Sequence, residues 1–246
     1  MSSPTSRFLS VPTAALLALT VLVGCGSNSD EPVTAESSAS SASSAAATTA
    51  TETSAASETS SAAAVQAELP EGYKLISAPN NGQSFGVPEG WLEVDSQAMA
   101  NDAEIQAYLE QAGSETGMNA EMLKQQMAQL DVMAMSATRD AAGFAENVNV
   151  LAEPVSASVA PSAEEAKAMV EEVNGTAGTF AEVQTSLGEG VTQAYTAEVA
   201  GVDVGGVYII VPAGTGDGYS IITVSASDTA KAQEVADNIV KSLQKN

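Results

Sequence analysis

A 42-residue stretch near the N-terminus limits what this chain can fold into. Residues 26–67 contain 12 Ser, 6 Thr and 13 Ala, together with five acidic residues, no basic residue and no aromatic residue. Such a segment cannot bury enough apolar surface to offset the entropy lost on ordering, so it is predicted to be a disordered tether. The folded part is then expected at residues 69–246, which are long enough for one sizeable core.

The segment before the tether has the pattern of a secretory leader. Residues 1–24 carry one charge, Arg7, ahead of an apolar run that is shorter than the about 20 residues a membrane-spanning helix needs. The sequence Leu22-Val23-Gly24-Cys25 resembles the lipobox of bacterial lipoproteins. This resemblance implies cleavage before Cys25 and a diacylglycerol and palmitate anchor on it. The alternative is a plain signal peptide with an incidental or buried Cys25.

These patterns predict three parts and one location. We expect a lipoprotein signal peptide at 1–24, a lipidated Cys25 at the head of a tether spanning 25–68, and a single domain at 69–246. The lipid anchor at Cys25 would be the contact with the membrane. The domain would then lie outside the cytoplasm, on the outer face of the cell membrane.

The charge balance excludes several kinds of chemistry. The chain has 31 acidic and 8 basic residues, a net charge of −23, and no His. So acidic a surface repels nucleic acid, and without His the usual general base and the commonest metal ligand are missing. Because of this acidity we expect no nucleic-acid partner. Because His is missing and the only Cys is assigned to the anchor, we also expect no metal and no cofactor. Residues 68–246 hold 26 acidic and 7 basic residues, which gives −19 for the domain.

Within the domain, the spacing of apolar residues predicts an α+β fold. Asn80-Asn81-Gly82 predicts a primed hairpin turn, and Ser162 with Glu165 predicts a helix-capping box. Short Gly-rich loops at 201–206 and 214–218 allow only antiparallel neighbours, so we expect a largely antiparallel sheet flanked by helices. Residues 177–187 are ambiguous. The expected strands are 73–78, 83–87, 132–138, 144–152, 191–199, 207–211 and 219–226, and the expected helices are 101–112, 119–130, 163–173 and 228–244.

Two motifs in the domain resemble those of a known family. Phe85-Gly86-Val87-Pro88-Glu89-Gly90-Trp91 is similar to the F-x-V-P-x-G-W opening of the PsbP-like α-β-α sandwich, and residues 143–150 resemble its GF-x-x-N-V-N-V strand. With the lipobox and the tether, the chain resembles actinobacterial lipoproteins of the LpqN/LpqT type. The resemblance implies an antiparallel sheet flanked by helices and a noncatalytic role in binding or assembly. Metal binding among photosynthetic relatives uses His, which this chain lacks, so it is not carried over.

No catalytic group is predicted. Ser84 lies in a literal G-x-S-x-G sequence but on an expected hairpin strand, without a His base. Ser242 and Lys245 are placed in the last turn of the final helix, where Lys complements the helix dipole. The acidic residues of the 163–173 helix are expected on its solvated face. The chain is therefore not expected to be an enzyme, although a carboxylate-based hydrolase acting on envelope polysaccharide is the alternative, and a spacer without a ligand is a third possibility.

The candidate ligand-binding residues are Met118, Met122, Met127 and Trp91. Methionine suits both irregular cores and adaptable apolar surfaces, so these side chains either pack in the core or line a groove for an envelope protein or a lipid-like ligand. Core packing is the favoured interpretation for the methionines and for Trp91, and a Cu(I) site is a further alternative for the methionines. Asn147 and Asn149 are expected on a polar outer strand face or bonded to a loop.

Overall fold

The strands form where the sequence is rich in β-branched and aromatic residues. The computed structural model describes residues 66–94, 125, 127–141, 143–199 and 202–246, which belong to one structural unit. The elements within these residues are, in chain order, β1 (Tyr73–Ala78), β2 (Gln83–Pro88), β3 (Trp91–Val94), β4 (Leu130–Ser136), β5 (Asn147–Leu151), α5 (Ala163–Glu172), β6 (Thr176–Thr185), β7 (Gly188–Val199), β8 (Val202–Pro212), β9 (Tyr219–Ala226), α6 (Thr229–Ser242) and β10 (Gln244–Lys245).

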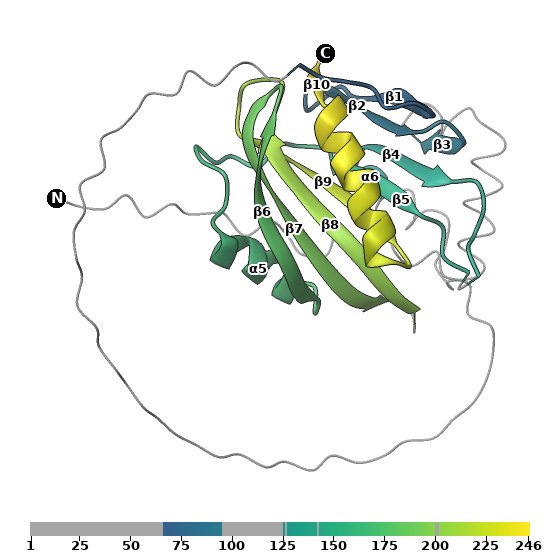
Figure 1. The fold of residues 1–246 in the computed structure, drawn as a ribbon. Helices are drawn as coiled ribbons and strands as arrows, with labels where there is room; N and C mark the ends of the chain where they lie inside the picture. The colour runs from purple at the N-terminus through teal and green to yellow at the C-terminus, as the bar shows by residue number, and fades with distance from the viewer. Residues whose placement is uncertain (1–65, 95–124, 126, 142, 200–201) are drawn as a thin grey trace, which may run out of the picture. The chain divides into compact units, whose positions relative to one another are not determined.

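Seven of these strands form one antiparallel sheet, in the order β3-β4-β5-β9-β8-β7-β6 (Figure 1). The consecutive strands β6 to β9 pair directly with one another, because short connections allow only antiparallel neighbours. The predicted meander is therefore confirmed, and β6 is left at an edge of the sheet. A second sheet, which the sequence did not indicate, joins β1, β2 and β10.

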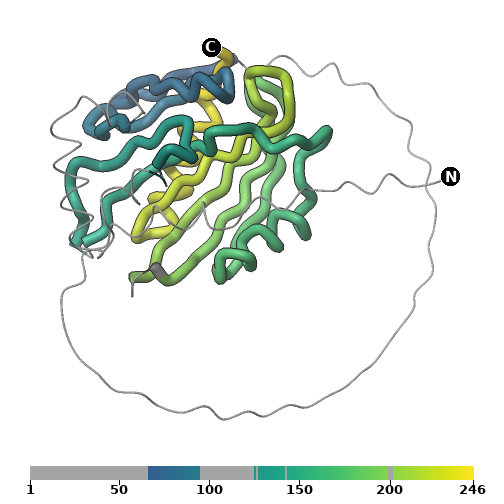
Figure 2. Tube along the Cα trace, turned by 180° about the vertical axis from the view of Figure 1, so that it is seen from behind, coloured from purple at the N-terminus to yellow at the C-terminus, as the bar shows by residue number. Residues whose placement is uncertain are grey.

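The two described helices cover opposite faces of the seven-stranded sheet. The predicted apolar stripe of α6 packs in one hydrophobic core with Val207 and Ile209 of β8. On α5, Val170 packs in another core with Tyr208. Successive strand side chains point to opposite faces, so the helices lie on opposite sides of β8 (Figures 1 and 2). This arrangement confirms the predicted fold class, α+β with a largely antiparallel sheet flanked by helices.

Helix α5 begins and ends where the local sequence predicts. The Ser162 hydroxyl accepts a hydrogen bond from the Glu165 backbone N–H at 3.3 Å, and the Glu165 carboxylate accepts one from the Ser162 backbone N–H at 2.9 Å. This reciprocal pair is the predicted capping box. At the other end Asn174 adopts φ 56°, a left-handed conformation that stops the helix.

Removing the cap should weaken the protein measurably. We expect Ser162→Ala to lower the free energy of unfolding by about 1 kcal/mol, because one helix N–H then loses its acceptor. Urea denaturation followed by circular dichroism measures the change. Ser158→Ala, at an exposed serine in the preceding loop, is the matched control and should stay within about 0.5 kcal/mol. Equal losses in the two variants would contradict the capping role.

The turn between β1 and β2 differs from the prediction. Both types of primed turn need positive φ at the first central residue, but Asn81 does not have it, and only Gly82 does, at 65°. The turn runs instead from Pro79 to Gly82, where the Gly82 N–H donates to the Pro79 carbonyl at 3.1 Å. The reason is tertiary: the Asn81 side chain is fully buried and hydrogen-bonded to Asp131 and Leu151.

Three predicted boundaries are also wrong. Leu130 begins β4 rather than continuing a helix, because it pairs with Leu151 of β5. Helix α6 ends at Ser242, since Leu243 turns extended and buries its side chain in the core, which places Lys245 in β10. The predicted loop at 201–206 is too long, because β8 begins at Val202 and so includes Gly206; a Cβ there would come within 2.1 Å of the Tyr195 ring. The predicted helices at 101–112 and 119–129 fall outside the described residues, apart from 125 and 127–129.

Candidate functional site

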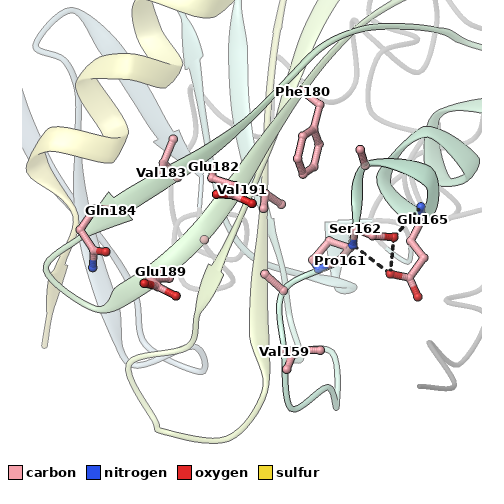
Figure 3. A pocket seen from close by; sticks show the side chains of 13 residues that line it. Val159, Pro161, Ser162, Glu165, Phe180, Glu182, Val183, Gln184, Glu189 and Val191 are labelled. Carbon is pink, nitrogen blue, oxygen red and sulfur yellow. Dashed lines mark hydrogen bonds between the residues drawn. The ribbon is translucent and has the colours of Figure 1, made fainter. Parts of the chain in front are cut away.

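A pocket of about 720 Å³ opens between the start of α5 and the β6–β7 hairpin (Figure 3). Its volume lies within the range of about 300–1,000 Å³ that is common for small-ligand sites. One wall is the loop that leads into α5, and the other is the face of the sheet that α5 covers. The lining residues are Val159, Ala160, Pro161, Ser162, Ala163, Glu165, Phe180, Glu182, Val183, Gln184, Glu189, Gly190 and Val191.

The strand register explains how the sheet wall is built. Phe180, Glu182 and Gln184 alternate along β6, so their side chains share one face. Across the ladder Glu182 pairs with Val191 and Gln184 pairs with Glu189 of β7. Phe180 and Val191 supply apolar surface, and the two glutamates supply charge beside it. The pocket therefore combines an apolar wall with carboxylates.

The charges at this pocket have one sign. Glu165, Glu182 and Glu189 line it, and among the described residues that line it there is no Lys or Arg. A helix N-terminus normally attracts anions, but here Glu165 already accepts hydrogen bonds from the Ser162 N–H at 2.9 Å and the Ser162 hydroxyl at 2.8 Å. The pocket is thus suited to a cation or a hydrogen-bond donor and unsuited to an anion.

Polar side chains also run through the interior on the same face of the sheet. Asn149, Thr223, Tyr208 and Gln193 are cross-strand neighbours in turn, and all four are buried. Asn147, next to this row, is also buried, and its side-chain N–H donates to the Ala145 carbonyl at 3.1 Å. The expectation of a polar outer face for Asn147 and Asn149 is therefore wrong, because both faces of β5 are covered, whereas the alternative of a hydrogen bond to a loop is confirmed for Asn147, since Ala145 lies in the loop before β5.

Two tyrosines pack against each other in this interior. The Tyr195 and Tyr208 rings stack with centroids 4.7 Å apart and planes at 30°. Burial raises the pKa of Tyr195 above its usual value, and the neighbouring Ser225 and Tyr208 side chains partly offset the rise. Burial also raises the pKa of Tyr208, with a smaller contribution from Tyr195. Both phenols therefore stay protonated at neutral pH and serve as buried hydrogen-bonding groups.

Of the sequence-predicted ligand-binding residues, the structure describes Met127 and Trp91, and these two do not line the pocket. Cys25, Met118 and Met122 lie outside the described residues. Met127 and Trp91 are 3% and 6% exposed, and Trp91 packs in the core that α6 covers. Neither side chain is among those that line the pocket. For these two, the structure favours core packing.

Ser84 and Ser242, the serines of the two motifs, form hydrogen bonds that connect parts of the fold. Ser84 lies in β2, as expected, and its hydroxyl bonds to the Asn246 side chain. The Ser242 hydroxyl is buried, donates to the Asn238 carbonyl at 2.6 Å, and accepts from the Gly86 N–H at 2.8 Å. These contacts tie α6 to β2, and Lys245 is in β10 rather than one helical turn away. Neither serine is placed as a nucleophile.

Two further features concern only the described part of the chain. Within it, no group of three or more Cys, Asp or Glu side chains is close enough to hold a metal ion. No helix in the same residues is sufficiently long and apolar to span a bilayer.

The pocket residues were missed because the sequence around them carries no strong local signal. Residues 177–187 mix Gly, Thr and Ala with single apolar residues, which suits neither a helix nor a half-buried strand clearly. The alternation of Phe180, Glu182 and Gln184 was the available clue to one strand face. The pairing partner on β7 and the position of α5 decide that this face is a pocket wall, and neither can be read locally.

Comparisons with known proteins give similarity to solved structures but none to a family model or a curated protein. No protein-family model matches the chain, and no curated protein matches it. The chain is similar to the solution structure of cyanobacterial PsbP (CyanoP) from Synechocystis sp. PCC 6803, with 14% identity and a TM-score of 0.40. The match covers 71% of this chain and 93% of that chain. This similarity transfers no site, ligand or partner to the chain.

Proposed function

We propose that this chain is a lipid-anchored lipoprotein of the bacterial envelope, of the LpqN/LpqT type, whose α+β domain binds a partner and catalyses no reaction. The observation that carries the binding role is the pocket beside α5, which has an apolar wall and charges of one sign. The lipobox ending at Cys25 supports the anchor. Residues 26–67 would supply a reach of roughly 35 Å, at about 5–6 Å × √n for a flexible linker.

Binding fits the pocket better than hydrolysis of envelope polysaccharide. A carboxylate hydrolase sets two carboxylates about 5–10 Å apart on opposite sides of the scissile bond. Glu182 and Glu189 are both exposed and project from the same face of neighbouring strands. Glu165 lies on the other side of the pocket, but its carboxylate is engaged in capping α5 (Figure 3). These positions favour a role for the carboxylates in ligand recognition.

Native mass spectrometry of the chain purified from the membranes of its own host tests this function. The expected mass lacks residues 1–24, carries a diacylglycerol group and a further acyl chain on Cys25, and is accompanied by a species with a bound component. Cys25→Ser should remove the lipid mass and release the chain from the membrane fraction. An intact leader, or a lipidated chain recovered only in the empty form, would overturn the corresponding half of the proposal.

A further inference from the structure

In the part of the chain that the structure describes, β6 has one edge without a neighbouring strand. It is the last strand in the order of the seven-stranded sheet, so among the described strands only β7 lies beside it (Figure 1). It is ten residues long, contains no Pro, and buries only Thr185. The backbone N–H and C=O groups along such an edge are a template for another extended segment.

The usable part of this edge lies next to the pocket. The pairing of β6 with β7 is regular from Phe180 to Thr185 and is interrupted by a register shift between Ala177 and Phe180. That irregularity disturbs the strand on one side and leaves residues 180–185 as a regular ladder. Phe180, Glu182 and Gln184, which line the pocket, belong to this regular part. A strand added beside it would send every second side chain toward the face on which the pocket opens.

The negative charges of the pocket favour a partner segment that carries a basic residue. Glu165, Glu182 and Glu189 meet a Lys or Arg side chain favourably, and the apolar surface of Phe180 and Val191 suits the methylene stem of such a residue. A second copy of this chain is a poorer fit. Residues 68–246 carry a net charge of −19, so two copies would bring like charges together at the same edge.

We propose that β6 and the adjoining pocket form a docking site for an extended segment of another envelope protein, which pairs with residues 180–185 and places a Lys or Arg side chain among the pocket glutamates. The proposal rests on the binding function above and specifies the class of partner and the mode of recognition. The main-chain hydrogen bonds would give affinity, and the basic side chain would give specificity.

A library of random decapeptides displayed on phage and selected on the full-length chain in detergent micelles tests this proposal. The selected peptides should alternate apolar or β-branched residues and carry Lys or Arg at one or two positions. A synthetic copy of one such peptide should protect the amides of residues 180–185 from hydrogen exchange. The double variant Glu182→Lys/Glu189→Lys should bind it at least about tenfold more weakly, which corresponds to about 1.4 kcal/mol.

A variant with the same change in net charge is the matched control. Glu198→Lys/Glu234→Lys changes two exposed glutamates outside the pocket and should alter the affinity by less than about twofold. Three outcomes would overturn the docking site: no selected peptide, peptides without a basic residue, or protection of amides elsewhere. Self-association that protects residues 180–185 would assign the edge to a second copy instead. None of these results would contradict the proposed function itself, which the mass-spectrometric experiment tests separately.

Discussion

Replacing Asp131 with alanine should lower the free energy of unfolding by about 3–5 kcal/mol. Asp131 lies in β4 and is 7% exposed. Its carboxylate accepts hydrogen bonds from the backbone N–H groups of Asn80 and Asn81 at 3.1 and 2.9 Å, and from the Asn81 side chain at 2.9 Å. Alanine would leave donors at the buried turn without this acceptor. Urea denaturation monitored by circular dichroism measures the loss.

Two further variants separate the hydrogen bonds from a general effect of removing an aspartate. Asp131→Asn keeps the shape and one acceptor oxygen, so its cost should fall between those of wild type and alanine. Asp203→Ala, at an exposed position in β8, should change the stability by less than about 0.5 kcal/mol. Equal stability of Asp131→Ala and Asp203→Ala would show that the buried turn does not depend on this carboxylate.

Elements with strong local signals were predictable from the sequence. The Ser162 and Glu165 pair predicted the start of α5, because a capping box is closed by residues three apart. The stripe on α6 predicted its buried face, and β1 and β9 have the predicted bounds. Antiparallel pairing of the last strands followed from loop length alone. In each of these elements the sequence pattern that predicts the structure lies within a short stretch of the chain.

Features that depend on distant partners were not predictable. Asn81-Gly82 has the local chemistry of a primed turn, but Asp131, 50 residues away, holds Asn81 in another conformation. β10 exists because the chain after α6 returns to pair with β2. The pocket has the same origin. Its glutamates come from α5, β6 and β7, and only the packing of α5 on β6 brings Glu165 to the pocket with the strand residues.

Gly214→Ala should destabilise the protein by about 3 kcal/mol, near the upper end of the cost of overpacking a core. Gly214 lies in the β8–β9 loop against the β1–β2 turn, and a Cβ there would come within 1.8 Å of the Gly82 carbonyl oxygen. The neighbouring backbone cannot easily yield, because Gly82 accepts a hydrogen bond from the Asn246 N–H at 3.1 Å. The Asn81 carbonyl also accepts one from the Thr215 N–H at 3.3 Å. Thermal and urea denaturation would both report the loss.

Gly90→Ala is the control for this prediction, because Gly90 also lies in a loop but has open space where a Cβ would stand. It should be neutral or slightly stabilising, since alanine restricts the unfolded chain. A Gly214→Ala variant as stable as Gly90→Ala would contradict the close approach of the two loops. The double variant Asp131→Ala/Gly214→Ala adds a second check. Both changes loosen the same turn, so their combined cost should be smaller than the sum of the two single costs.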